Sequence, residues 1–157
     1  MSKSKFFFIT FLFALWWGGF TFYSSIVVHL GMEILGDHIK MGMITKSVTN
    51  YINGIGSIVL FISLPFLIAN KKTGENYFHI IGWEWFVLVC LQLVLLYVHH
   101  VLASMITVAG TITLQPGFYN VHRIYLLTST AMWVVIPLLY YRLIKTHINT
   151  TGSAFAP

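Results

Sequence analysis

The stretch GWEWFVLVCLQLVLLYVHHV, Gly82–Val101, decides the fold that this sequence can adopt. It contains one carboxylate, Glu84, near its start, and its other ionisable side chains are a cysteine, a tyrosine and two histidines towards its end. About 20 helical residues of this kind are needed to cross the hydrocarbon core of a bilayer. We therefore predict that this stretch forms a membrane-spanning helix.

Three further stretches of the 157-residue chain are similarly long and apolar. The whole sequence is 57% hydrophobic and 8% charged, and its mean hydropathy is +0.81. We therefore predict an all-α integral membrane four-helix bundle in which residues 1–157 form a single four-span domain. The expected spans are 6–30, 51–69, 82–101 and 122–141.

The formal net charge of +5 does not indicate a nucleic-acid partner, because the basic residues lie singly or in pairs at span ends. An excess of Lys and Arg marks the cytoplasmic side of a membrane protein. Here one side carries Lys3, Lys5, Lys71, Lys72, Arg142 and Lys145, and the other carries Lys40, Lys46 and Arg123. Both termini are therefore expected in the cytoplasm.

This topology places the segments 31–50 and 102–121 on the outer side. The first begins with a half-polar stretch, Gly31–His38, which we interpret as an interfacial helix or a re-entrant turn between spans one and two. The second contains Gln115, Pro116 and Gly117, a turn signal.

Helical phase suggests which side chains of span one face the bundle. Ala14, Gly18, Thr21, Ser25 and His29 follow one another at steps of three or four and therefore share a face. Small residues are typical of faces on which membrane helices pack closely. The pattern predicts that this face is buried and that His29 points into the bundle.

The other spans carry similar polar stripes. Gln92 and His99 are seven residues apart in span three, and His122 and Ser129 have the same spacing in span four. His100 is rotated away from the first stripe, and Asn53 of span two lies at a similar depth. The sequence therefore predicts a cluster of His29, His99 and His122 at the outer end of the bundle.

Three interpretations of this histidine cluster remain open. The imidazoles can hydrogen-bond within the bundle and close it, they can bind haem b or a metal, or they can form a proton or substrate path. A covalent c-type haem is excluded because there is no Cys-x-x-Cys-His motif. Copper is a candidate metal because thioethers favour Cu(I). The methionines expected near the outer side are Met32, Met41, Met43 and Met105.

The sequence does not predict catalytic residues. Glu84 is the one carboxylate within a span, and we interpret it as an interfacial anchor that reaches water between Trp83 and Trp85. No serine in the spans has an adjacent histidine and carboxylate pair that would make it a nucleophile. The chain is therefore not expected to be an enzyme.

Three short segments carry a family resemblance. They are Trp16–Tyr23, Lys46–Asn53 and His122–Leu126. The chain resembles small four-span bacterial membrane proteins of unknown function, which are similar in layout to copper-resistance membrane domains. The resemblance implies a bacterial cytoplasmic membrane and supports the four-span layout, but it implies no activity.

Two classes of function are therefore expected. The first is a non-catalytic accessory or structural subunit of a larger membrane complex, with the lipid bilayer and other membrane subunits as partners. The alternative is a haem b-binding or copper-binding membrane protein that uses His29, His99 and His122 for electron transfer or metal handling.

Overall fold

The computed structural model describes residues 3–69, 75–109, 111–114 and 116–152. Within these ranges four helical segments are long and apolar enough to cross a membrane, and they are Ser4–Leu35, Ile39–Pro65, Ile81–Met105 and Phe118–Lys145. The first is composed of α1 (Lys3–Phe22), a π-helical segment η1 (Tyr23–Val27) and α2 (Val28–Leu35). The others are α3 (His38–Ala69), α4 (Glu75–Met105) and α5 (Phe118–Gly152).

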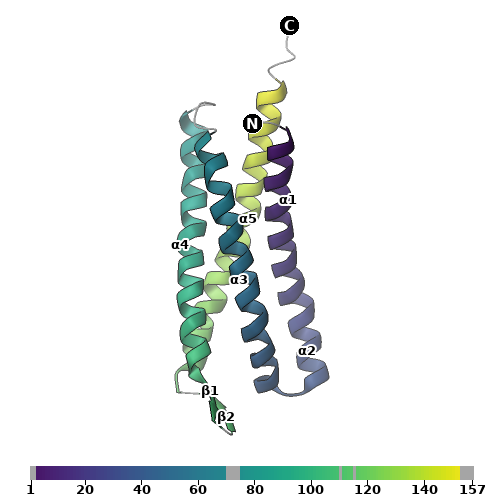
Figure 1. The fold of residues 1–157 in the computed structure, drawn as a ribbon, viewed down its shortest axis with the longest axis vertical. Helices are drawn as coiled ribbons and strands as arrows, with labels where there is room; N and C mark the ends of the chain where they lie inside the picture. The colour runs from purple at the N-terminus through teal and green to yellow at the C-terminus, as the bar shows by residue number, and fades with distance from the viewer. Residues whose placement is uncertain (1–2, 70–74, 110, 115, 153–157) are drawn as a thin grey trace.

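The helices lie side by side, as Figure 1 shows, and both chain termini lie at the same end. α1 packs against α3 and α5, and α4 packs against α3 and α5, so the four helices form a closed ring. We call the end with the termini the terminal end. The opposite end carries a β-hairpin, and we call it the hairpin end.

The connection between the first two long helices differs from the prediction. α3 begins at His38 and not near Tyr51, so residues 39–50 belong to a long helix and not to an outer loop. The predicted interfacial segment is also wrong, because α2 continues the first helix to Leu35. Gly36 ends it in the left-handed conformation with φ 57°, and the carboxylate of Asp37 accepts the backbone N–H of Ile39 at 2.8 Å. These two caps allow a very short turn.

The connection between α4 and α5 is a β-hairpin that we did not predict. Strands β1 (Ile106–Ala109) and β2 (Thr111–Leu114) pair antiparallel, with Ile106 opposite Leu114. The sequence ITVAGTITL alternates partly between apolar residues and threonine around a central glycine, which is a hairpin signal. Gly117, with φ 86°, then starts α5 by accepting the backbone N–H of Asn120 at 3.0 Å.

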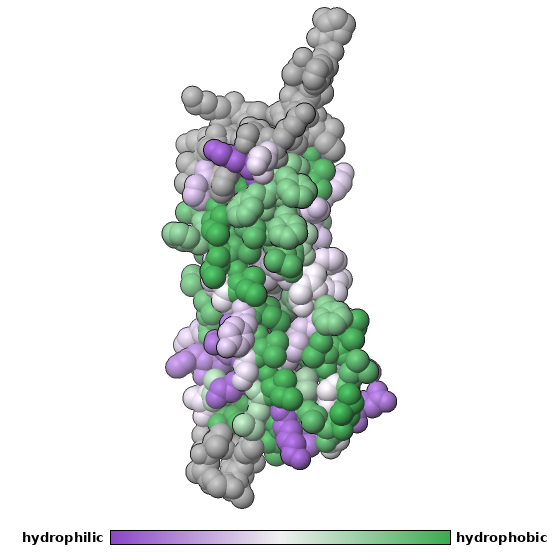
Figure 2. All heavy atoms as spheres, turned by 45° about the vertical axis from the view of Figure 1, so that its right-hand side comes forward, coloured by the Kyte–Doolittle hydropathy of each residue, from purple (hydrophilic) through white to green (hydrophobic). Residues whose placement is uncertain are grey.

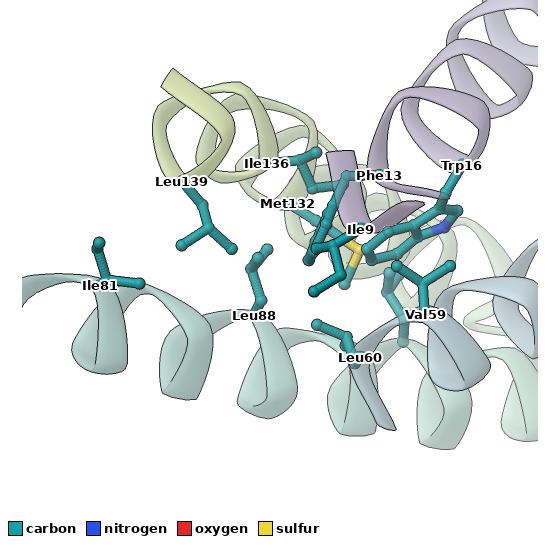
Figure 3. Packing of buried hydrophobic residues seen from close by; sticks show 11 residues of the cluster. Ile9, Phe13, Trp16, Val59, Leu60, Ile81, Leu88, Met132, Ile136 and Leu139 are labelled. Atoms are coloured by element: carbon teal, nitrogen blue, oxygen red, sulfur yellow. The ribbon is translucent and has the colours of Figure 1, made fainter. Parts of the chain in front are cut away.

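Large side chains from all four helices fill the core. Figure 3 shows them pointing towards one another, with Phe13, Leu88 and Leu139 almost completely buried. Trp16 packs directly on Gly56 of α3, where an added Cβ would lie 2.4 Å from the indole ring. By contrast, a Cβ on Gly18 or Gly19 would meet nothing within 4 Å. The close helix approach in this chain therefore depends on Gly56 rather than on the Gly-Gly pair of α1.

Polar side chains join the helices within this apolar frame. Trp17 of α1 donates to the carbonyl of Trp133 at 3.0 Å, and Trp133 donates to Thr21 at 2.8 Å. Gln92 of α4 donates to the carbonyl of Asn53 at 2.7 Å. The described surface of the bundle is mostly hydrophobic, and in Figure 2 the hydrophilic residues gather mainly towards the hairpin end.

Candidate functional site

The hairpin end of the bundle contains a partly open pocket with a volume of about 350 Å³. We call it the hairpin-end pocket. Its walls come from the end of α1, from η1 and α2, and from the adjoining ends of α3, α4 and α5. Most of the lining is apolar. The polar and ionisable side chains on it are Tyr23, Ser24, Thr45, Lys46, Thr49, His99, Tyr119, His122, Tyr125 and Ser129.

Two of the three predicted histidines meet at this pocket. His99 of α4 and His122 of α5 both line it and are half-buried. His100 is exposed and does not line the pocket, so the prediction that His99 faces the bundle and His100 faces outward is confirmed. The seven-residue spacing of His99 from the buried Gln92 correctly predicted the face of α4 that turns towards the bundle.

The third histidine lies elsewhere. His29 is exposed and does not line the pocket, so the prediction that it points into the bundle is wrong. Four members of the small-residue stripe, Ala14, Gly18, Ser25 and His29, are exposed. The fifth, Thr21, is half-buried and accepts a hydrogen bond from Trp133 of α5. The buried face instead carries large residues at the same kind of spacing. These are Ile9, Phe13, Trp16 and Tyr23.

The physical reason for this reversal is the space between the helices. In a ring of four helices, bulky side chains from each helix are needed to fill the centre to the density of a protein interior. A small-residue face fits a closely approaching pair of helices and would leave voids in the centre of this ring. The aromatic stripe therefore turns inward.

Each of the two pocket histidines has an aromatic neighbour. The ring of His99 lies 6.3 Å from that of Tyr125, centroid to centroid. The ring of His122 stacks on Phe118 at 5.8 Å with an interplanar angle of 9°. These contacts fix the positions of the two imidazoles on the pocket wall, while their ring nitrogens can still bind a ligand.

Buried hydroxyl and amide groups gather beside the pocket, and sequence reasoning missed most of them. Tyr125 of α5 lies beside Asn53 and Thr49 of α3, and Tyr23 of η1 lies near it. Tyr23 is 7% exposed, and its hydroxyl has no hydrogen-bond partner among the described residues. Buried polar groups are nearly always satisfied, by protein, water or a ligand. The hydroxyl is itself buried, so Tyr23 lines the pocket through its other atoms.

The backbone beside Tyr23 is unusual. Residues 23–27 form a π-helical turn between α1 and α2. Such turns redirect a helix and are frequent at functional sites. Beyond this turn α2 packs against α3, and Figure 1 shows α2 well separated from the start of α5. The pocket lies where these helices diverge.

Lys46 of α3 is the one Lys or Arg on the pocket lining, and none of the lining residues is an Asp or Glu. Its ammonium group donates to the carbonyl oxygen of Ala103 at 3.2 Å, in the last turn of α4. It also interacts electrostatically with His99. The pocket therefore has a positive electrostatic character.

The candidate cofactors would use different side chains of this pocket. For a haem, the pocket offers the imidazoles of His99 and His122 on two neighbouring helices. For copper, it adds the thioethers of Met32 and Met41. Among the described residues, no group of three His, Cys, Asp or Glu side chains could hold a metal. The sulfur of Met41 packs against Gly31.

The other ionisable group of interest, Glu84, lies far from this pocket, towards the terminal end of α4. It forms an ion pair with Arg142 of α5 at 2.7 Å, and its side chain is 13% exposed. The interpretation of Glu84 as an anchor that reaches water is therefore replaced by a largely buried ion pair between α4 and α5. Its second oxygen has no hydrogen-bond partner. The hairpin-end pocket remains the stronger candidate site, because it combines volume with convergent polar groups.

No family model, no curated protein and no solved structure matches this chain.

Proposed function

We propose that this protein is an integral membrane protein that binds a small amphipathic molecule in the hairpin-end pocket. The observation that carries the proposal is a partly open pocket of about 350 Å³ in which apolar walls meet the side chains of His99, His122 and Lys46. Small-molecule sites typically measure roughly 300–1,000 Å³ and combine apolar walls with a few polar groups. They also occur between the helices of bundles.

The chemistry of the lining supports binding rather than catalysis. The wall offers imidazole, phenol, hydroxyl and ammonium groups, which can orient a ligand by hydrogen bonds. Among the described residues, no carboxylate lines the pocket that could orient a histidine in a triad. We therefore assign the protein to membrane-embedded ligand-binding proteins.

Gly42 offers a direct test of this assignment. It lines the pocket, and a Cβ at this position would meet nothing within 4 Å. A Gly42→Leu variant would therefore fill part of the pocket without a clash at its Cβ, and it would also favour the helix. Gly18→Leu is the matched control, because Gly18 is exposed, lies outside the pocket and has the same free space.

The experiment compares small molecules that co-purify with the full chain in a neutral detergent, identified by mass spectrometry after extraction. We expect wild-type protein and Gly42→Leu to differ by about ten-fold or more in one bound species, and Gly18→Leu to retain that species. An absorption spectrum and elemental analysis of the same samples test haem and copper. If wild-type and Gly42→Leu protein carry the same molecules in the same amounts, the proposal is wrong.

The accessory-subunit hypothesis remains an alternative proposal, supported by the large hydrophobic side chains that all four long helices expose. Lipid can cover these side chains equally well. The two functions make different predictions for Gly42→Leu. An accessory subunit would keep its place in a larger complex when the pocket is filled, whereas a ligand-binding protein would lose its bound molecule. Native electrophoresis of membranes that contain each variant distinguishes the two results.

A further inference from the structure

We infer that the ligand of the hairpin-end pocket is an anionic amphiphile, whose carboxylate or phosphate head binds Lys46 while its hydrocarbon part lies against the apolar wall. This inference rests on the proposed function and specifies the chemical class of ligand. It follows from three features of the pocket: an ammonium group with no acidic residue among the described lining residues, hydroxyl donors on the same lining, and apolar walls in a partly open pocket.

The first feature is the charge of Lys46. This residue is half-buried and lies within a helix that is apolar enough to cross a membrane. A charged side chain at such a depth is costly unless it is paired, and it usually marks a ligand or ion path. The carbonyl of Ala103 satisfies one of its three N–H donors. An oxyanion in the pocket would satisfy the others and neutralise the charge.

The neighbours of Lys46 also favour an anion over a cation. His99 and His122 add imidazole N–H donors, and none of the described residues that line the pocket is acidic. Tyr119 is exposed and lines the pocket, and its phenol can donate a hydrogen bond. An oxyanion accepts hydrogen bonds from an ammonium group and from a phenol, and such charge-assisted bonds are the strong ones.

The remaining wall suits a hydrocarbon chain. It includes Phe20, Ile52, Leu102 and Leu126, which come from four different helices. The pocket is partly open. A chain attached to the bound head could therefore leave the pocket and lie in lipid.

The test measures binding of three probes with the same alkyl chain to the full-length protein in a neutral detergent. The probes are dodecanoate, monododecyl phosphate and dodecanol, and calorimetry gives each dissociation constant at a pH at which the acids are ionised. We expect at least one anion to bind about ten-fold or more tightly than the alcohol. The tighter of the two anions identifies the source as a fatty acid or a phospholipid head.

The Lys46→Met variant keeps an unbranched side chain and removes the charge. We expect it to reduce anion affinity about ten-fold and to leave dodecanol affinity unchanged. Lys40→Met is the matched control, because Lys40 lies on the same helix, is exposed and pairs with Asp37 at the surface. It should bind all three probes like the wild-type protein.

The outcomes separate this inference from the proposed function. If dodecanol binds wild-type protein as tightly as both anions, or if Lys46→Met leaves anion affinity unchanged, the pocket does not recognise the charge of its ligand and the inference is wrong. The proposed function survives that result when Gly42→Leu still abolishes binding of the probes. If Gly42→Leu binds every probe like the wild-type protein, the pocket is not the binding site and both proposals fail.

Discussion

The contact between Trp16 and Gly56 predicts a large effect for a single added methyl group. In a Gly56→Ala variant the new Cβ would lie 2.4, 2.5 and 2.7 Å from three atoms of the Trp16 indole, which is rigid and 4% exposed. Overpacking of this kind costs about 1–3 kcal/mol, and three close contacts on a buried ring place it near the upper value. Replacing a helical glycine by alanine returns about 1 kcal/mol. We therefore expect a net loss of about 2 kcal/mol in the free energy of unfolding.

Gly54→Ala is the control, because it lies on the same helix and a Cβ there would meet nothing within 4 Å. The gain in helix propensity from alanine is the same at both positions. The unfolding free energies of the two variants should therefore differ by about 3 kcal/mol, which is the steric cost alone. The assay is loss of helical circular dichroism as a denaturing detergent is added to protein in a neutral one. A second substitution, Trp16→Leu, should reduce the penalty of Gly56→Ala. Equal stability of the two alanine variants would refute the packing argument.

Three further predictions concern the pocket, the ion pair and the topology. Tyr23→Phe removes an unpaired buried hydroxyl beside the pocket, so it should leave the unfolding free energy unchanged or raise it by about 1–3 kcal/mol in the same denaturation assay. Arg142→Met leaves the Glu84 carboxylate without its partner and should destabilise the protein by about 1–2 kcal/mol, less than a fully buried pair because Arg142 is 39% exposed. The double variant with Glu84→Leu should recover most of this loss in the same denaturation assay. A phosphatase that is active only outside the cytoplasm should remain inactive when fused after Pro157, and activity would reverse the proposed orientation.

The faces of α4 and α5 could be predicted from the sequence because polar residues interrupt otherwise apolar helices at a regular interval. Gln92 and His99, like His122 and Ser129, are separated by two helical turns and fall on the same side. Burying a polar side chain among other helices is cheaper than exposing it to lipid. Where polar residues define a stripe, the sequence therefore predicts that this face of the helix turns towards the other helices.

The face of α1 could not be predicted in the same way. Two stripes with helical spacing compete there, one of small residues and one of large aromatic residues, and periodicity alone does not rank them. The large stripe is buried because α3 provides Gly56 as a space for Trp16. That space belongs to another helix, so only the tertiary structure reveals it. Tyr23 was missed for the same reason, since it lies seven residues after Trp16 on the stripe assigned to lipid.

The start of α3 was missed because its first turns are less apolar than the rest of the helix. Residues 38–50 include two lysines, one glycine and several hydroxyl groups, and hydropathy alone assigns such a segment to a loop. In the structure these residues form part of the pocket wall, where Lys46 and Thr49 face polar groups of the other helices. The polar residues of the pocket wall thus lower the hydropathy of the start of α3, and this concealed both the helix and the pocket.

The lining of the pocket is itself an argument about what fills it in the membrane. Because this pocket of about 350 Å³ is partly open, water or lipid can enter it. Water could satisfy the polar wall near Lys46 but would gain little against Phe20, Ile52 and Leu126. A molecule with one polar end and one apolar end satisfies both walls at once, and this is why an amphiphile fits the pocket better than water or a free ion.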